Sequence, residues 1–254
     1  LSLLFGHFET VTLDPFTLKV ASEYLEKKWR LTGLDGDAKH FLISLSGGHP
    51  FYLNVFGQHL SVYPSSELRN PSKSVIPVLD KRLFNAQGIL SQYFTRRLER
   101  LFSSDRSGKY EVLLQALSKK AHTFQEIRGL FKSVKDIRPK LAQLIDAGIL
   151  SQHGVFYRIS DRLFAFWMRS CFERKSNVLA RNISEQSLGF REEAEEAMRH
   201  FSGLLKKASH EKLIELFASF KGEMVEIDQK AHRLPHFSEV RLYNGKKGEF
   251  TIVG

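Results

Sequence analysis

Apolar positions in residues 109–161 first follow a helical spacing and then alternate. Residues 109–120 place one apolar stripe on a short helix, made of Val112, Leu113, Ala116 and Leu117. Thr123 and Glu126 match a capping box. In such a box the threonine hydroxyl accepts from the backbone N–H of the glutamate, and the glutamate side chain accepts from the backbone N–H of the threonine. This pair opens a second short helix, through Leu130. A third helix is expected to end near Leu150, with the apolar side chains Ile137, Leu141, Leu144 and Ile145 facing inward.

The segment after that helix predicts a two-stranded ribbon. Gly148 is expected to stop the helix in the left-handed conformation. Residues 151–154 are expected to turn between residues 149–150 and residues 155–159. Three short helices followed by a hairpin are typical of a winged helix-turn-helix domain, which the sequence predicts for residues 106–180.

The third helix has two candidate starts, at Ser133 and at Asp136. Ser133 as the cap would put Pro139 inside the helix, where its missing N–H removes a hydrogen bond at a cost of about 3 kcal/mol. Asp136 as the cap puts Pro139 in the first turn, where the missing N–H costs nothing. Asp136 is therefore the favoured start.

The N-terminal half predicts a small helical bundle in residues 1–65. Alternating apolar residues near Phe8 to Leu13 indicate a short strand, and Thr17 caps a helix that runs to Trp29. Further helices are expected at residues 39–45 and 51–60. Residues 66–105 are expected to hold a connector, rich in proline and serine within residues 61–80, and a long helix at 85–102.

The C-terminal part, residues 181–254, predicts a small α/β region. Two helices are expected, at residues 184–200 and then through Phe220. Strand-like runs follow at residues 223–227, 237–243 and 249–253, with a hairpin signal at Asn244-Gly245. The predicted fold class is α+β and predominantly helical.

Charge is distributed unevenly along the chain. The formal net charge is +10, and residues 66–180 hold 21 Lys/Arg against 10 Asp/Glu, whereas the parts on either side are close to neutral. The basic excess is confined to the predicted winged helix and to the connector and long helix that precede it. Such a localised excess favours binding to nucleic acid. The alternative is that these basic helices are simply solvated faces.

Two motifs in the N-terminal half carry a family resemblance. Residues 13–21 (LDPFTLKVA) follow the expected strand, and residues 46–53 (SGGHPFYL) lie between two expected helices. Together they resemble the end of an AAA+ ATPase module of the STAND or archaeal-ATPase type, including its small helical lid. Residues 157–167 (YRISDRLFAFW) resemble the segment that follows the winged helix in the same family, with Asp161 as a helix cap.

The resemblance implies an ATP or ADP site in the parent protein. The family's Gly-x-Pro element packs near the adenine of the nucleotide, so the implied cofactor-binding residues are Gly47, Gly48, His49 and Pro50. The chain holds no G-x-x-x-x-G-K-[ST] loop, and Ser107-Gly108-Lys109 lacks the earlier glycine and a preceding strand. We therefore expect a C-terminal part that begins after the ATPase core, with no catalytic residue of its own. The missing core is an expected partner.

The C-terminal region corresponds, in that family, to the beginning of a restriction-endonuclease-like domain. Such a nuclease needs an acidic residue on one strand and a Glu-x-Lys on the next to hold Mg²⁺. Glu249 stands where an Asp is expected, and no Glu-x-Lys follows it. Nuclease chemistry is the weakest of the functional interpretations.

The remaining features exclude several other classes. The single cysteine, Cys171, has apolar neighbours, which favour a core thiol and fit a reducing cytoplasm. No apolar run approaches the roughly 20 residues that a membrane span needs, and residues 1–13 lack the features of a signal peptide. The scattered histidines suggest no metal site. We expect a cytoplasmic protein without a membrane partner.

The expected partner is double-stranded DNA. A winged helix puts its third helix into the major groove and its hairpin against the adjacent backbone. The polar residues on those elements are therefore the candidate DNA contacts: Lys132, Lys135, Arg138, Lys140, Gln143, His153 and Arg158. The rival hypothesis is a winged helix that binds a protein partner or a second copy of the chain. Pairing of Lys132, Lys135, Arg138 and Lys140 with carboxylates of the lid would favour that rival.

Overall fold

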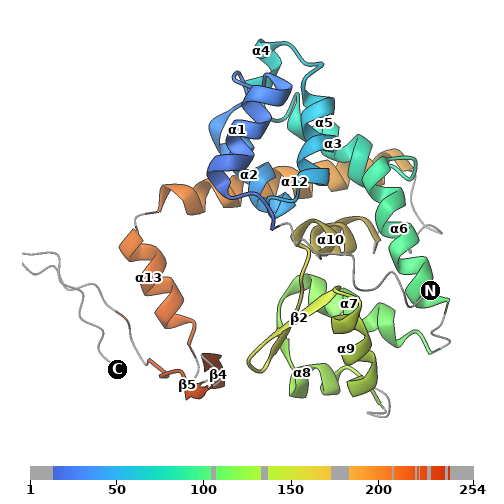
Figure 1. Ribbon diagram of the computed structural model, residues 1–254, viewed down its shortest axis with the longest axis vertical. Coiled ribbons are helices and arrows are strands. Elements are labelled where there is room, and N and C mark those ends of the chain that lie inside the picture. Colours follow the sequence, from blue (N-terminus) through green and yellow to red (C-terminus); the bar gives the residue numbers. More distant parts are fainter. Residues whose placement is uncertain are drawn as a thin grey trace, which may run out of the picture.

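The structure is a computed structural model that is mostly helical and carries small antiparallel sheets (Figure 1). It describes residues 14–103, 107–132, 137–172, 183–207, 209–220, 222, 224–227, 230–237 and 240. The predicted α+β, predominantly helical class is confirmed. No helix in the described ranges is long and apolar enough to cross a membrane.

Three helices form the upper bundle in Figure 1: α1 (Leu18–Trp29), α2 (Gly36–Ser46) and α3 (Pro50–Leu60). Thr17 caps α1 by accepting from Val20 N at 3.4 Å, as predicted, and Asp35 caps α2 by accepting from Ala38 N at 2.9 Å. The apolar stripes of the three helices meet in a shared core that includes Leu25, Leu42, Leu53, Phe56 and Leu60. The expected strand at residues 8–13 lies outside the described residues.

The predicted connector is more regular than its composition indicated. It holds α4 (Ser65–Leu68), α5 (Val75–Leu79) and the π-helical turn η2 (Asp80–Phe84). Pro64 lies just before α4 and does not prevent it, because a proline at the start of a helix removes no intrahelical bond. The long helix α6 is Ile89–Phe102, four residues shorter than expected, because the Asn85 N–H bonds to Asp80 O and closes η2 instead.

The lower unit contains three helices and a three-stranded sheet. Its helices are α7 (Lys109–Lys119), α8 (Phe124–Gly129) and α9 (Ile137–Asp146). Its strands are β1 (His122–Thr123), β2 (Leu150–His153) and β3 (Phe156–Ile159), arranged in the antiparallel order β1-β3-β2. The sequence did not predict β1, which pairs Thr123 with Phe156.

Two predicted boundaries in this unit are wrong. The third helix ends at Asp146, before Leu150, because Gly148 takes a φ of +66° and Leu150 already pairs with Ile159. Residues 151–153 belong to β2, so the bend lies at Gly154, whose φ is +57°. The capping box is confirmed, since Glu126 N donates to Thr123 Oγ1 at 3.3 Å and Thr123 N donates to Glu126 at 2.7 Å. The preferred cap, Asp136, lies outside the described residues.

Helix α10 (Arg162–Trp167) and the turn η3 (Met168–Phe172) lie between the two units, where their aromatic side chains fill the junction. Asp161 caps α10 as predicted, accepting from Phe164 N at 3.0 Å. Phe164 and Trp167 pack on Phe94 of α6 with ring centroids 5.3 and 5.6 Å apart.

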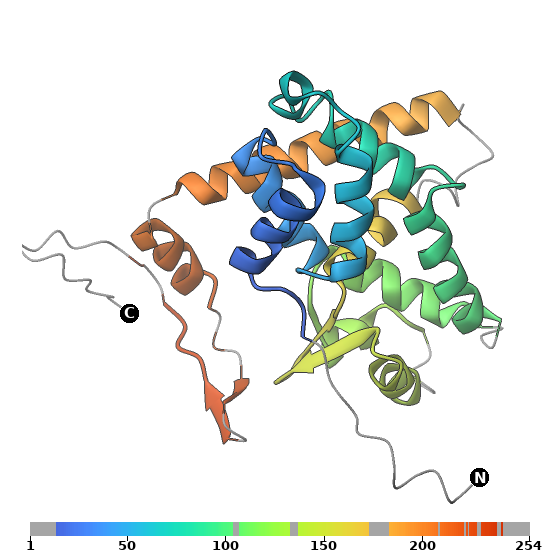
Figure 2. The same cartoon turned by 45° about the horizontal axis from the view of Figure 1, so that its top comes forward.

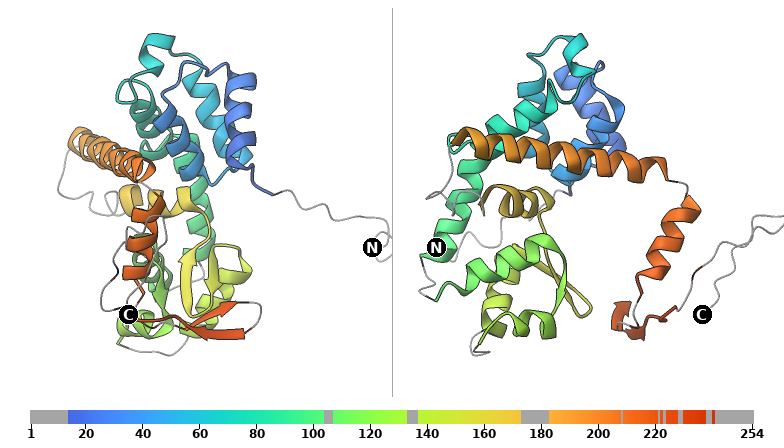
Figure 3. Two further views of the ribbon diagram at one scale, coloured as in Figure 1. Left: turned by 90° about the vertical axis from the view of Figure 1, so that its left-hand side faces the viewer. Right: turned by 180° about the vertical axis from the view of Figure 1, so that it is seen from behind.

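The long helix α12 (Ile183–Lys206) lies across the upper bundle, as the orange helix in Figures 2 and 3 shows. It extends beyond the predicted His200. Arg191 of α12 bonds to the buried Asp80 carboxylate at 2.6 Å, and Ser187 bonds to it at 2.9 Å. Phe190 stacks on Phe84 at 5.2 Å. These contacts fasten α12 to η2.

Helix α13 (Ser209–Ala218) and the hairpin of β4 (Met224–Ile227) and β5 (Lys230–Arg233) follow. Strand β4 was predicted, whereas β5 was not, since its sequence has no apolar alternation. The expected runs at residues 237–243 and 249–253, with the Asn244-Gly245 turn, lie wholly or largely outside the described residues.

Candidate functional site

A cleft of about 890 Å³ lies between the upper bundle and the lower unit. Its walls come from segments far apart in the sequence: the segment before α1, α2 and the loop to α3, α6, the turn before β2, the chain from β3 to α10, and the C-terminal end of α12. The polar and aromatic lining residues are Phe16, His40, Ser44, Ser46, His49, Tyr52, Tyr93, Arg97, Arg158, Ser160, Asp161, Arg162 and Phe201. A ligand in this cleft would contact both units.

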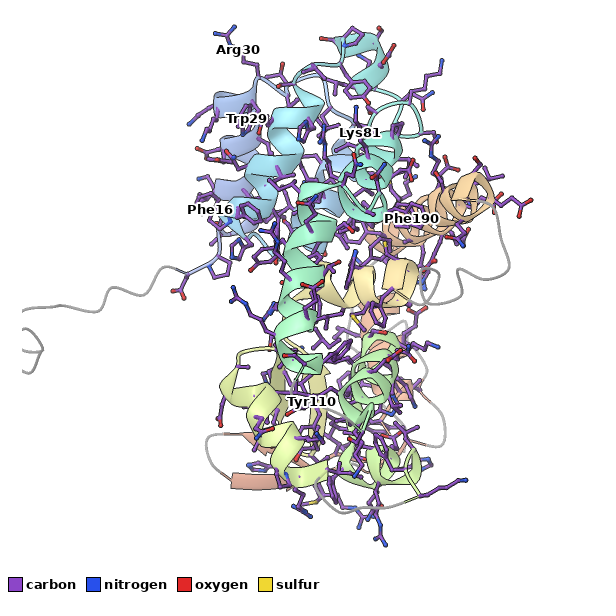
Figure 4. All side chains as sticks on the ribbon, turned by 90° about the vertical axis from the view of Figure 1, so that its right-hand side faces the viewer. Phe16, Trp29, Arg30, Lys81, Tyr110 and Phe190 are labelled. Carbon is purple, nitrogen blue, oxygen red and sulfur yellow. The ribbon has the colours of Figure 1, made fainter. Side chains whose placement is uncertain are left out.

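The α2–α3 loop forms one edge of the cleft. Gly47 and Gly48 have φ values of +60° and +74°, a conformation that favours glycine. Phe16 N donates to Gly48 O at 2.9 Å, and a Cβ on Gly48 would lie 2.2 Å from Phe16 O. Gly48 therefore lets the segment before α1 lie directly against the loop, and Figure 4 shows Phe16 at this edge of the upper bundle.

The same loop starts α3. His49 is the N-cap, and its Nδ1 accepts from Phe51 N at 3.2 Å. Pro50 is the first residue of α3, where its fixed φ suits a helix start. Of the four predicted cofactor-binding residues, Gly47, Gly48 and His49 line the cleft and Pro50 lies just behind them. The positive end of α3 therefore lies beside the cleft.

A polar cluster at the back of the cleft joins the two units. The Tyr52 hydroxyl donates to Asp161 Oδ2 at 2.5 Å, and Arg97 Nη1 lies 3.6 Å from the same oxygen. Arg97 Nη2 also donates to Gly148 O at 3.3 Å. Burial raises the pKa of the Tyr52 hydroxyl above its usual value, and the neighbouring Asp161 carboxylate raises this pKa further. Tyr52 therefore remains a hydrogen-bond donor throughout the neutral range.

The cleft is electrostatically suited to an anion. Its lining residues include Arg97, Arg158 and Arg162 but a single carboxylate, Asp161. Arg162 reaches across to donate to Ser44 Oγ at 3.3 Å, and Arg158 donates to Ser151 Oγ at 3.3 Å. Both arginines therefore donate to neutral hydroxyls. These hydrogen bonds do not neutralise the positive charge of either guanidinium group.

The outward face of α9 carries a second group of predicted site residues. The Arg138 guanidinium lies 4.1 Å from the centre of the Phe124 ring, and Lys140 Nζ lies 4.2 Å from that of the Tyr110 ring. The Tyr110 hydroxyl donates to Gln143 Oε1. Cation–π contacts of this kind contribute about 0.5–1 kcal/mol at exposed positions. Arg138 and Lys140 are therefore held over the first residues of α8 and α7.

Lys132 and Arg138 allow a test of the predicted pairing with carboxylates of the upper bundle. Within the described ranges, neither Lys132 nor Arg138 makes an ion pair with a carboxylate, and both are exposed. The observation that would favour a protein partner is thus missing for these two residues. Lys135 lies outside the described residues.

The two hairpin candidates share the outer face of the sheet. Arg158 pairs across the ladder with Ser151, and His153 pairs with Phe156, so the alternation of a strand puts all four on one side. His153 is exposed near the tip of the hairpin. Arg158 also lines the cleft, whereas Lys132, Arg138, Lys140 and Gln143 do not.

Sequence reasoning did not identify Tyr52, Tyr93, Arg97 and Arg162 as cleft residues. No local pattern marks them, because their partners lie far away in the chain: Arg97 is 51 positions from Gly148 and Tyr52 is 109 positions from Asp161. In the part of the chain that the structure describes, no group of three or more His, Cys, Asp or Glu residues is placed to hold a metal ion. The sequence matches no protein-family model, and no curated protein matches it.

Proposed function

We propose that the lower unit is a winged helix that binds duplex DNA, and that the chain is the C-terminal part of an AAA+/STAND-type ATPase. The observation that carries the proposal is the outward face of α9. It bears Arg138 and Lys140, fixed over aromatic rings, and Lys132 precedes it. Arg138 and Lys132 have no carboxylate partner among the described residues. This basic surface lies on the helix that enters the major groove in such domains.

The order β1-β3-β2 supports the winged-helix assignment. A short strand between the first two helices pairs with the hairpin that follows the third helix. The inner face of α9 is fixed by the buried residues Ile137, Leu141 and Leu144, so its outer face is free of core packing. Docking this face on DNA would bring His153, at the hairpin, toward the adjacent backbone.

The nucleotide part of the proposal rests on the cleft. Gly47, Gly48 and His49 form an edge that a flat base can approach, and three arginines supply positive charge. The upper bundle is then the lid, and the ATPase core is the partner that completes the site with its phosphate loop. Because Arg97 and Asp161 connect the cleft to the lower unit, ATP or ADP there would bias the position of the winged helix. This connection is the basis of the proposed nucleotide control.

A protein-binding role for the winged helix is the second candidate. The observation that favours it is the fastening of the lower unit to the lid through Tyr52, Arg97 and Asp161. A domain held in this way can transmit the state of the ATPase to a partner. The third candidate, a nuclease-like fragment, gains nothing from the described residues.

The experiment that tests DNA binding compares the parent chain with an Arg138→Ala/Lys140→Ala variant. If about five phosphates are neutralised, log K should fall against log salt with a slope of about −4 to −5, and the variant should flatten that slope by up to about 2. The matched control is Arg69→Ala/Lys73→Ala, which removes the same charge from exposed positions beside α4, at the opposite end of the molecule (Figure 1).

Thermal unfolding must accompany the titration, because Arg138 and Lys140 pack on Phe124 and Tyr110. Loss of both ring contacts should cost no more than about 2 kcal/mol, so the variant should remain folded. Absence of binding by the parent at low salt, or an unchanged slope in the variant, would leave the protein-partner role as the better explanation.

A further inference from the structure

Helix α6 presents two arginines to solvent that its own packing does not require. Its buried face consists of Leu90, Ser91, Phe94 and Leu98. Arg97 is engaged by the Asp161 carboxylate and Gly148 O, whereas Arg96 and Arg100 are exposed. No carboxylate in the described ranges pairs with either of these two. Glu99 is also exposed on α6, so Arg96 and Arg100 leave this solvent face with a net positive charge.

This surface adjoins the proposed DNA-binding face. Arg97 ties α6 to Gly148, in the turn that follows α9. The chain leaves α6 and soon enters α7, whose Tyr110 contacts both Lys140 and Gln143 of α9. In Figure 4, α6 runs down the face of the molecule toward Tyr110. The C-terminal half of α6 thus contacts α7, which in turn contacts α9.

We infer that Arg96 and Arg100 contact the phosphate backbone of a duplex whose major groove holds α9. The inference rests on the proposed DNA binding and extends its footprint from the winged helix to α6. A backbone strand that flanks α9 on the α7 side runs past Tyr110 and reaches α6. Arg96 and Arg100 lie about one helical turn, or about 6 Å, apart on α6, so both guanidinium groups face the same strand.

Charge chemistry favours a phosphate backbone as the occupant. Guanidinium groups bind phosphate oxygens in paired hydrogen bonds, and they keep their charge at every physiological pH. The exposed apolar side chains of α6, Ile89 and Tyr93, lie in its N-terminal half, away from Arg100. The surface between Arg96 and Arg100 therefore lacks the apolar centre typical of a protein interface.

The contact makes affinity depend on duplex length. A duplex of about 10 base pairs covers α9 and the hairpin, whereas one of about 25 base pairs also reaches α6. Two additional phosphate contacts steepen the salt slope by about 1.8 and give roughly tenfold more change in affinity between 50 and 200 mM salt. The parent should show this gain on the longer duplex.

The test measures binding of the full chain to both labelled duplexes over a range of salt concentrations. The variant Arg96→Ala/Arg100→Ala should bind the short duplex like the parent and lose the gain on the long one. Arg96→Lys/Arg100→Lys, which keeps the charge, should retain most of the slope. Arg69→Ala/Lys73→Ala controls for net charge, and thermal unfolding confirms that each variant is folded.

The outcomes separate this inference from the proposed function. If the parent binds neither duplex, both are overturned. If Arg138→Ala/Lys140→Ala weakens binding while Arg96→Ala/Arg100→Ala binds the long duplex with the parent's slope, DNA binding stands and the α6 contact is wrong. An equal loss in the Arg69→Ala/Lys73→Ala control would mean that net charge, rather than this surface, sets the affinity, and it would also overturn the inference.

Discussion

Tyr52 and Asp161 lie 109 positions apart in the sequence, and the hydroxyl of the first donates to the carboxylate of the second at 2.5 Å. Tyr52 belongs to α3 in the upper bundle, and Asp161 starts α10 below it. The same carboxylate caps α10 and faces Arg97. One side chain therefore sets the start of a helix and the position of two units relative to each other.

Removing the Tyr52 hydroxyl should destabilise the chain by about 1.5 kcal/mol or more, because a hydrogen bond to a charged acceptor is stronger than one between neutral groups. Tyr24→Phe is the comparison, since that hydroxyl donates to the neutral Asn54 amide at 3.1 Å and accepts from the exposed Lys28 ammonium at 3.1 Å. At this more solvent-exposed position the loss should cost about 1 kcal/mol or less. Urea unfolding of Tyr52→Phe and Tyr24→Phe measures the difference. Equal losses would mean that the Tyr52 bond adds nothing beyond an ordinary hydrogen bond.

The two glycines of the α2–α3 loop should respond differently to alanine. Both have positive φ, which costs a residue with a Cβ roughly 1 kcal/mol. Gly47 has open space around its Cβ position, whereas a Cβ on Gly48 would lie 2.2 Å from Phe16 O. Gly48→Ala should therefore lose clearly more free energy of unfolding than Gly47→Ala, and it should detach the segment before α1. Identical unfolding midpoints would show that the Phe16–Gly48 contact is not maintained in solution.

Local patterns predicted most of the described helices, because their signals lie within a few residues, but they missed α4, α5, β1 and β5. Thr17, Thr123 and Asp161 were recognised as caps from their own neighbourhoods, and each cap bond is present. The predicted end of a helix was wrong where the apolar spacing and a glycine favour different stopping points. The apolar residues Ile149 and Leu150 continue the helical spacing. However, Gly148 ends the helix with a positive φ, and Leu150 pairs with Ile159 in the sheet instead.

The sequence predicted one wall of the cleft and not the wall that faces it. Gly47, Gly48 and His49 carry a visible motif, but the facing wall is assembled by tertiary contacts. Arg97 looks like one of several arginines on an amphipathic helix until α10 packs beneath α6 and brings Asp161 to it. The position of Arg158 was also not predictable, since a hairpin arginine can face either DNA or the lid.

Acid should weaken the start of α8. Hydrogen bonding from the Thr123 backbone N–H lowers the pKa of Glu126 to about 2, and Lys120 contributes as well. Because the folded-state pKa lies below the ordinary value of 4.5, the stabilisation is present above that pH and is lost as the pH falls toward 2. Its size is about 1 kcal/mol or less, since the side chain is partly exposed.

Glu126→Gln should remove this part of the pH dependence and leave a chain slightly less stable at neutral pH. Thermal unfolding across the acidic range compares it with Glu192→Gln, an exposed glutamate on α12 that should change little. If both variants follow the parent's curve between about pH 4.5 and 2, the capping box does not contribute to acid sensitivity.

The chain by itself should not hydrolyse ATP and should bind nucleotide only weakly. The cleft offers Gly47, Gly48 and His49 as an edge for the base and arginines for charge, but the sequence contains no phosphate loop to enclose the β- and γ-phosphates. Without that cradle, dissociation constants of about 1 mM or weaker are expected for ATP and ADP by isothermal titration. A Gly48→Ala variant that stays folded should weaken even this binding, because it moves Phe16 at the edge of the cleft. Turnover by the parent that persists in Gly48→Ala would place the phosphate-binding elements elsewhere in the chain and would contradict the assignment of the upper bundle as a lid.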